Sequence, residues 1–423
     1  MNNISTPGGG SDMRCHHAPV NDCDCLPLRQ LTAALAVVFL AACGGGGGGI
    51  PAFTLFTGIA IADLNGDTRP DLVTSNIYID SSPPHLSHVT VSLQQTATPG
   101  AFGNGVDYPI GADSQFVAAG DLNNDGRIDL LATNYNDNSL SLLEQSLAIA
   151  GVFLPQTTLA TAAHPDGCVL ADINSDGVDD IVATGWYLAL LLNTPGNPGS
   201  FTDGGTITTN AYLPSVTAGD IDGDGRIDLV AADPTNGTVL VFLQDAAPAQ
   251  PGTYSGMTAY PAGDQPVDVE LADVDGDLKP DLVAANLGTP SDPDTASVAV
   301  LIQDHNPGAR GQFLAAVGYT TGARSGDVAV GDLNDDGLPD PAVANAGHLN
   351  DTGSVSILFQ GAMPGVFLGA VNIPGISQPL GLAIGDLNAD GLNDIAIADE
   401  GAAVLFQNTR VPGTFRPAVL IDR

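Results

Sequence analysis

One nine-residue segment, residues 220–228, carries oxygen-bearing groups at fixed intervals. It reads Asp-Ile-Asp-Gly-Asp-Gly-Arg-Ile-Asp, so carboxylates stand at positions 1, 3, 5 and 9. The backbone carbonyl of Arg226 is available at position 7. Carboxylate, amide and carbonyl oxygens are the ligands that a hard cation such as Ca²⁺ prefers. The segment therefore predicts a calcium-binding loop.

Close copies of this loop occur at six other places in the chain. Positions 1, 3, 5 and 9 are Asp or Asn in every copy, and in five loops we also assign the backbone carbonyl of position 7. The predicted ligands are Asp63, Asn65, Asp67, Asp71; Asp121, Asn123, Asp125, Arg127, Asp129; Asp172, Asn174, Asp176, Val178, Asp180; Asp220, Asp222, Asp224, Arg226, Asp228; Asp273, Asp275, Asp277, Asp281; Asp332, Asn334, Asp336, Leu338, Asp340; and Asp386, Asn388, Asp390, Leu392, Asp394. Seven loops predict up to seven bound Ca²⁺ ions.

Two other loop types share part of this pattern. An EF-hand needs a Glu at position 12 and a helix on each side. Position 12 is instead Thr74, Ala132, Ala183, Ala231, Ala284, Val343 or Ile397. An ordinary Asp/Asn/Gly turn would explain one copy, but seven copies in register favour a metal loop. Thr68 and Leu278 replace the glycine of position 6, so we rank the loops at Asp63 and Asp273 as weakest and those at Asp121, Asp220, Asp332 and Asp386 as strongest.

The spacing of the loops indicates the elements that carry them. Successive loops start 58, 51, 48, 53, 59 and 54 residues apart, which is the length of one four-stranded propeller blade. Around Asp121 we expect strands over residues 116–120, 129–134 and 139–143, and a fourth that begins near residues 151–153. The prediction is an all-β, seven-bladed β-propeller with four antiparallel strands per blade, over residues 50–423.

The sequence also makes predictions about how neighbouring blades pack and how the ring closes. Pro-Gly turns precede the fourth strands, and the aromatic residue that follows each turn is expected to pack between neighbouring blades. The ring closes either by placing the first and last blades side by side or by pairing residues 53–56 with the last blade.

The composition narrows the classes of partner. The chain has 11 Lys and Arg against 48 Asp and Glu, a formal net charge of −37, which excludes electrostatic binding to nucleic acid or to an anionic membrane surface. Only three of the acidic residues are Glu, and 23 of the 45 Asp occupy the loop positions. Bound Ca²⁺ would offset this repulsion, so we expect metal binding and folding to be coupled.

The first 49 residues have the order of an export signal. Basic residues precede an apolar run at residues 31–40, and the Leu-Ala-Ala-Cys segment that ends at Cys43 resembles the lipobox of bacterial lipoproteins. We therefore expect a signal peptide over residues 1–42, lipidation of Cys43 and a flexible tether over residues 43–49. The implied location is the outer membrane or cell surface, with membrane contact through the lipid only. The alternative is an ordinary cleaved signal, and Met13 is an alternative start.

The loop and its flanks also resemble a known repeat. The runs from Ala218 to Ala232 and from Ile384 to Ala398 are similar to FG-GAP/VCBS repeats, the units of the integrin-α-type seven-bladed β-propeller. This resemblance covers roughly residues 50–423 and implies calcium loops between the first and second strands of each blade. The Phe-Gly signature survives at Phe102-Gly103, whereas the Gly-Ala-Pro signature is degraded, for example to Ala-Ala-Asn at residues 284–286. That departure puts integrin-like ligand binding in doubt and favours the bacterial branch.

No set of residues in the sequence has the spacing of a catalytic centre. The histidines of the ring, His85, His88, His164, His305 and His348, match no hydrolase or zinc motif. We therefore expect no enzymatic activity and a monomeric, surface-tethered calcium-binding propeller that acts as an interaction or adhesion module for a protein or glycan. A carbohydrate-binding, lectin-like propeller is the alternative, and a polysaccharide-acting enzyme ranks third.

Overall fold

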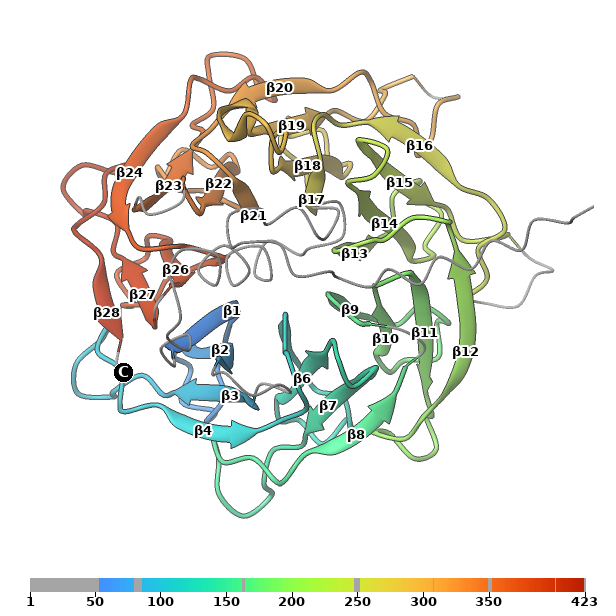
Figure 1. Ribbon diagram of the computed structural model, residues 1–423, viewed down its shortest axis with the longest axis vertical. Helices are drawn as coiled ribbons and strands as arrows, with labels where there is room; N and C mark the ends of the chain where they lie inside the picture. The colour runs from blue at the N-terminus through green and yellow to red at the C-terminus, as the bar shows by residue number, and fades with distance from the viewer. Residues whose placement is uncertain are drawn as a thin grey trace, which may run out of the picture.

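The chain folds into a ring of seven four-stranded sheets, which confirms the predicted seven-bladed β-propeller (Figure 1). The structure is a computed structural model that describes residues 53–79, 86–161, 164–246, 252–306, 308–348, 352–399 and 401–421. The expected signal peptide, Cys43 and the glycine tether lie outside the described residues, as does His85. Every pair of neighbouring strands within a blade is antiparallel.

Each blade uses four consecutive strands, counted from the axis outward. Blades 1 to 4 are formed by β1 (Phe53–Ala62), β2 (Asp71–Ile79), β3 (Leu86–Ser92), β4 (Val106–Pro109); β5 (Val117–Gly120), β6 (Asp129–Asn134), β7 (Ser139–Leu143), β8 (Thr157–Ala160); β9 (Cys168–Ala171), β10 (Asp180–Ala183), β11 (Tyr187–Asn193), β12 (Phe201–Thr208); and β13 (Val216–Gly219), β14 (Asp228–Asp233), β15 (Thr238–Phe242), β16 (Thr258–Pro261). Blades 5 to 7 are formed by β17 (Pro266–Ala272), β18 (Asp281–Asn286), β19 (Ser297–Leu301), β20 (Val317–Thr320); β21 (Ser325–Gly331), β22 (Asp340–Asn345), β23 (Gly353–Ile357), β24 (Val371–Ile376); and β25 (Gly381–Gly385), β26 (Asp394–Ala398), β27 (Ala402–Leu405), β28 (Val419–Ile421).

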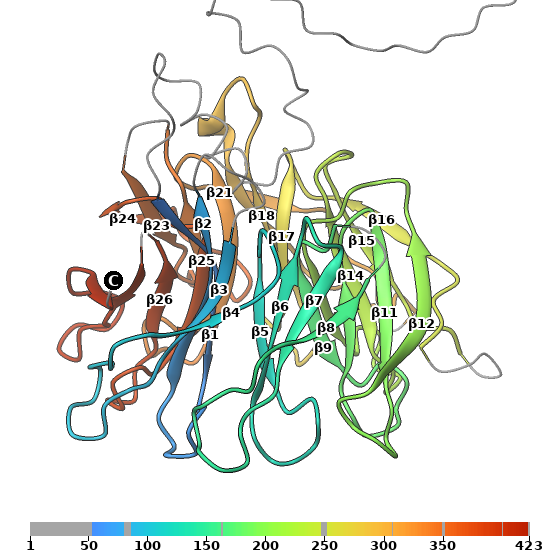
Figure 2. The same cartoon turned by 60° about the horizontal axis from the view of Figure 1, so that its bottom comes forward.

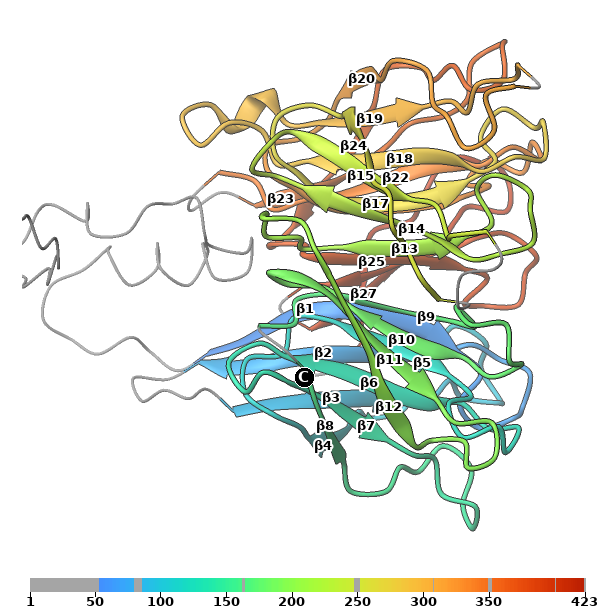
Figure 3. The same cartoon turned by 90° about the vertical axis from the view of Figure 1, so that its right-hand side faces the viewer.

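This topology separates the two faces of the ring. The loops that join the first to the second strand, and those that join the third to the fourth, lie on one face, which we call the metal-loop face. The loops that join the second to the third strand, and the connections between blades, lie on the opposite face. Figures 2 and 3 show the ring from the side, with the strands running between these faces.

The hydrophobic core lies between the blades. Leu64 and Val73 of blade 1, for example, are buried in one cluster with Leu130, Leu143 and Phe153 of blade 2. Phe153 is the aromatic residue after the turn of blade 2, and its ring contacts that of Tyr108 edge-on, with centroids 5.5 Å apart. The predicted packing of these aromatics between blades is therefore confirmed here.

The fourth strand starts later than the sequence predicted. In blade 2 it is β8 (Thr157–Ala160), whereas Gly151, Val152 and Phe153 precede it. Phe153 pairs with Gln145 through a single isolated bridge, and Gly151 has a positive φ of 72° that continues the turn. The chain therefore needs a few more residues before its pairing with β7 becomes regular.

Blades 1 and 7 close the ring by lying side by side. Residues 53–56 pair with residues 76–79 of β2 and not with the last blade. Apolar residues of both blades share one cluster, in which Ile59 and Leu72 meet Leu387 and Val404. The Gln94 side chain of blade 1 also donates a hydrogen bond to the Leu387 carbonyl of blade 7, at 2.8 Å. The first of the two expected closures is the one observed.

Helix contributes little to the part of the chain that the structure describes. Its labelled helical segment is the 3-10 turn η2 (Pro293–Thr295). No helix among these residues is both long and apolar enough to cross a bilayer.

Candidate metal sites

The seven acidic loops occupy equivalent places in the seven blades. Each joins the innermost strand to the second strand, as the loop from Asp121 does between β5 and β6. The ninth loop residue is in every case the first residue of the second strand and is buried: Asp71, Asp129, Asp180, Asp228, Asp281, Asp340 and Asp394. The loop is thus anchored in the core at one end and reaches the surface at its centre.

The carboxylate of position 1 folds the loop around itself. In the loop of residues 220–228, Asp220 accepts hydrogen bonds from the backbone N–H groups of Asp224, at 3.0 Å, and Gly225, at 2.9 Å. The residues of positions 5 and 6 donate in the same way in the other six loops. One carboxylate therefore sets the curvature that brings the other oxygens together.

The carboxylate of position 9 ties the loop to the third strand of its blade. Asp228 accepts one hydrogen bond from the backbone N–H of Ile221, at 2.9 Å, and another from that of Gln244, at 2.7 Å. The same pair of bonds recurs in all seven blades. Both oxygens of this carboxylate are used, so the residue holds the blade together as well as facing the site.

In five of the seven blades a side-chain amide then connects the loop region to a neighbouring blade. The Gln244 side chain donates to the Ile173 carbonyl of blade 3, at 2.7 Å. Equivalent contacts between blades are made by Gln94, Asn193, Gln303 and Gln360. Sequence reasoning missed this role, although a Gln or Asn after each third strand was a visible signal.

A glycine in the turn before the fourth strand of each following blade covers the third loop position. A Cβ atom added to Gly151 of blade 2 would lie 3.3 Å from the Asn65 Cβ and 2.9 Å from the Leu93 side chain of blade 1. The corresponding glycine of the other blades also lies against a third-position residue, as Gly365 does against Asp275. These glycines, expected only to form turns, also give neighbouring blades close contact at the metal-loop face.

Oxygens of positions 1, 3 and 9 converge in two of the loops. Asp220, Asp222 and Asp228 each place an oxygen within 4.8 Å of the others, and so do Asp273, Asp275 and Asp281. In two further loops the third-position amide oxygens of Asn174 and Asn334 are buried and lack any hydrogen-bond donor. Buried side-chain oxygens in proteins almost always have a partner, either a hydrogen-bond donor or an ion. This is the chemistry that a bound cation provides.

The two loops ranked weakest have the same geometry as the others. Thr68 and Leu278, which replace glycine, adopt positive φ angles of 69° and 68°. Their N–H groups still donate to Asp63 and Asp273, at 2.8 Å in each case. Leu278 is 92 % exposed, so its side chain meets no steric obstacle. The substitution therefore affects the conformational energy of the loop and not its shape.

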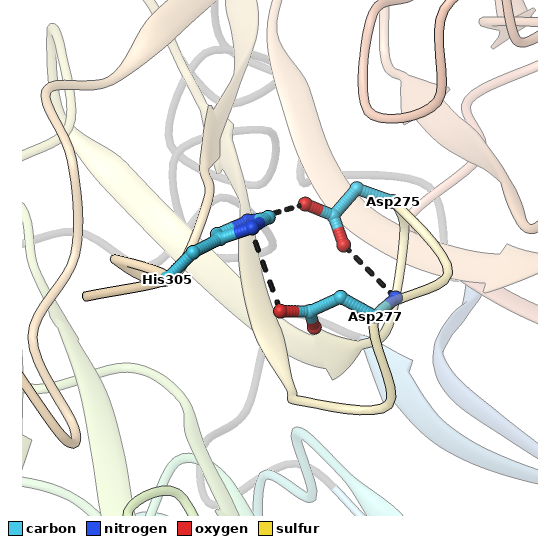
Figure 4. A group of neighbouring side chains, drawn as sticks. All are labelled: Asp275, Asp277 and His305. Carbon is cyan, nitrogen blue, oxygen red and sulfur yellow. Dashed lines mark hydrogen bonds and ion pairs between the residues drawn. The ribbon is translucent and has the colours of Figure 1, made fainter. Parts of the chain in front are cut away.

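One loop has an additional candidate ligand. His305, from the loop between β19 and β20, places Nε2 at 2.9 Å from an oxygen of Asp275 and 3.8 Å from one of Asp277 (Figure 4). Sequence reasoning found no partner for this histidine, because 28 residues separate it from the nearest of the two aspartates and only the fold of blade 5 brings them together.

Burial raises the pKa of the anchoring carboxyls at position 9 when no cation is bound. It raises the pKa of Asp228 to about 6, against the backbone hydrogen bonds that lower it, and raises the pKa of Asp340 and Asp394 to about 7. The remaining four have pKa values raised by burial to about 6 or 7: Asp71, Asp129, Asp180 and Asp281. Without a cation, the folded protein thus binds protons here that the unfolded chain releases.

This shift gives the metal-free protein an unusual pH dependence. Because these folded-state pKa values exceed the ordinary value of 3.8, their contribution to stability is present at low pH and is lost as pH rises from about 4 to about 7. The melting temperature of metal-depleted protein is expected to be several degrees lower at about pH 8 than at about pH 5. Thermal denaturation of protein stripped with chelator and then desalted checks this. A melting temperature that rises over the same interval would contradict it.

A comparison with protein-family profiles agrees with the repeat described above. The profile of the FG-GAP-like repeat matches residues 121–183 and 220–284. Each matched segment runs from position 1 of one acidic loop to position 12 of the next. A solved structure titled "Crystal structure of BBS1N in complex with ARL6DN, soaked with mercury" matches with a TM-score of 0.49 and 12 % identity, over 83 % of this chain and 91 % of that chain. Comparison with curated proteins gives no match.

Proposed function

Since the chain is a β-propeller built of FG-GAP-like repeats, we propose that it is a calcium-stabilised interaction module. The observation that carries this proposal is the sevenfold repetition of the acidic loop at one structural position. A reaction site needs one constellation of groups, whereas seven copies, each joined to its own blade and covered by the next, serve the scaffold. Under this proposal a partner binds to other surfaces of the ring, which the scaffold holds rigid.

Calcium fits the oxygen donors of the loops. Positions 1, 3, 5 and 9 offer carboxylate or amide oxygens without sulfur, a hard ligand set that suits Ca²⁺. The donorless oxygens of Asn174 and Asn334 are consistent with a cation partner. When bound, the ion supplies positive charge that offsets repulsion among the loop carboxylates. The protein's own contribution is the backbone hydrogen bonding that holds these oxygens in place.

The proposal also includes the anchoring and the location of the protein. Lipidation at Cys43 and a glycine tether over residues 43–49 would hold the ring at the outer membrane or cell surface of a bacterium. The membrane would then be contacted through the lipid alone. A monomeric ring presented in this way is suited to bind a protein or glycan partner without catalysing a reaction on it.

Carbohydrate binding is a second candidate, and one observation favours it. Trp186 is 40 % exposed, and its ring contacts that of Tyr212 with centroids 5.3 Å apart. Exposed aromatic rings of this kind can stack on the apolar face of a sugar. A glycan array with the calcium-loaded protein, compared with the Trp186→Ala variant, would test it. Binding that disappears in the variant supports the lectin, and an array without hits removes it.

The proposed role as an interaction module predicts calcium-dependent binding to a component of the cell envelope. The protein is expected to bind a defined component of the cell envelope in calcium and to lose most of that binding in chelator, because the ring that presents the surface loosens. Surface plasmon resonance on immobilised protein, with isolated envelope fractions in calcium or chelator, measures this. Restoration by added calcium is the control. Equal binding in both conditions, or no binding in either, would contradict the proposal.

A further inference from the structure

A cavity of about 600 Å³ lies on the axis of the ring. All seven inner strands contribute to its wall, and Asp166, Tyr212 and Pro234 extend it to the face opposite the metal loops. Cavities of this size commonly hold small organic ligands. The seven loops discussed above do not line it, so its chemistry is separate from theirs.

The wall of this cavity carries negative charge without a counterion. Asp166, Asp268, Glu270 and Asp327 line it, and no Lys, Arg or His is among the described residues that do so. The repeat does not require these carboxyls. The position of Asp268 and Asp327, five residues before each acidic loop, is Gly, Phe or Ser in the other blades. The position of Glu270 is Ala, Val or Thr in the other six.

Two of the carboxyls are fixed by contacts from neighbouring blades. Asp268 accepts hydrogen bonds from the Ser215 hydroxyl, at 2.5 Å, and from the backbone N–H of Val328, at 3.0 Å. Asp327 accepts one from the backbone N–H of Leu382, at 2.5 Å. Burial, followed by the charge of Asp268 and a hydrogen bond to it, holds the pKa of Asp327 well above its usual range. The pair is thus held in place by groups from blades 4, 6 and 7.

Glu270 differs from these two because it has no partner. Among the described residues nothing forms a hydrogen bond or ion pair with its carboxyl, although it is only partly exposed and lines the cavity. Burial raises its pKa to about 8. A largely buried carboxyl without a partner is unfavourable for the folded protein. Its presence therefore points to a ligand that supplies the missing partner.

Asp166 and Tyr212 form part of the wall of the same cavity. Asp166 is 7 % exposed, and one of its oxygens accepts a hydrogen bond from the Tyr212 hydroxyl, at 2.6 Å. No described residue donates to its other oxygen. The Tyr212 ring lies against Trp186, and its hydroxyl also interacts with that of Tyr135. The face of an aromatic ring attracts cations.

From these independent observations we propose that the axial cavity binds an organic ammonium ion, with Glu270 and Asp166 as the carboxylates of its wall and Tyr212 as the aromatic residue of that wall. The carboxyls exclude anions and leave a neutral ligand without an ionic partner. The Tyr212 ring and the cavity volume favour an organic cation over a bare metal ion. The cation could be a free ammonium compound or the side chain of a lysine. This proposal does not depend on calcium binding by the loops.

Binding of a cation should also release protons. The titratable side chains that line the cavity are Asp166, Cys168, Tyr212, Asp268, Glu270 and Asp327. Burial raises the pKa of Asp166 to about 7 and that of Glu270 to about 8, so both are partly protonated near neutral pH in the unliganded protein. A bound ammonium ion favours their ionised forms. The measured binding heat should then depend on the ionisation enthalpy of the buffer.

Isothermal titration calorimetry on the full-length protein tests the proposal with choline and with Nα-acetyl-lysine methylamide as probes. We expect saturable binding of at least one probe at a single site, with tighter binding of choline indicating a free ammonium ligand and tighter binding of the lysine derivative indicating a side chain. The Glu270→Gln and Asp166→Asn variants should each weaken binding by about tenfold or more. The Asp203→Asn variant, which removes an exposed charge on β12 away from the cavity, should bind as the parent does.

Three results would overturn the proposal. One is the absence of saturable binding of either probe at millimolar concentration. Another is equal binding of 3,3-dimethylbutanol, the neutral isostere of choline, which would show an apolar cavity. The third is displacement of the probe from the parent protein by Ca²⁺ added beyond the concentration that saturates the seven loops, which would show that the cavity is a metal site. Glu270→Gln should keep or raise the melting temperature at about pH 8, because it removes an unpartnered carboxyl, and this verifies that the variant folds.

Discussion

Removal of the proposed calcium ions is expected to lower the melting temperature of the protein by about 10 °C or more. Each loop carries three or four carboxylates, and a cation that binds only the folded ring stabilises it. A single site at a free calcium concentration one hundred times its Kd contributes about 2.7 kcal/mol. Several such sites in one cooperative ring add to a large effect, even though a ring of this size responds less per kcal/mol than a small domain does.

Differential scanning calorimetry at neutral pH measures this effect. Protein dialysed against chelator is compared with the same sample after calcium is restored, and magnesium at equal concentration serves as the control for ionic strength. Native mass spectrometry then counts the bound ions, with seven as the upper limit set by the loops. A melting curve that chelator leaves unchanged would contradict the proposal that calcium stabilises this protein.

Replacing a buried anchoring carboxylate should be the most damaging single substitution in a loop. Asp228→Ala leaves the backbone N–H groups of Ile221 and Gln244 without acceptors, and both residues are buried. Each unsatisfied buried donor costs about 1–3 kcal/mol, so the free energy of unfolding should fall by about 3–5 kcal/mol. The change also loosens the Gln244 contact to Ile173 of blade 3. Urea denaturation of the metal-free protein gives the measurement.

Asp228→Asn is the matched control for this substitution. It keeps the shape and one acceptor oxygen, and it mimics the protonated carboxyl that the raised pKa of about 6 favours in the absence of metal. In metal-free protein at about pH 5 it should therefore cost much less than Ala, about 1 kcal/mol. In calcium it should remove part of the stabilisation, because a charge is lost. Equal effects of Ala and Asn in metal-free protein would show that the two hydrogen bonds are unimportant.

Most of the blade could be predicted from local sequence. Residues 129–134 and 139–143 form β6 and β7 as expected, because alternating and continuous apolar runs between Asp/Gly-rich turns can only be satisfied by short paired strands. The fourth strand was misplaced because a positive-φ glycine and one isolated bridge precede its regular pairing. A backbone detail of that kind has no separate signal in the sequence.

The sequence by itself determined the repeat, its period and the acidic loop, since each of these depends on residues close together in the chain. Only the tertiary structure decided how the blades interact: the closure of the ring through Gln94 and Leu387, the glycine contacts at the metal-loop face and the position of His305 beside Asp275.

The axial cavity also depends entirely on the tertiary structure. Asp166, Glu270 and Asp327 are far apart in the sequence, and each one alone resembles an ordinary polar residue next to a strand. They line one cavity because the inner strands of all seven blades converge on the axis. The physical reason is that a loop's ligand set is encoded by local backbone geometry, whereas a site on the symmetry axis exists only once the whole ring has closed.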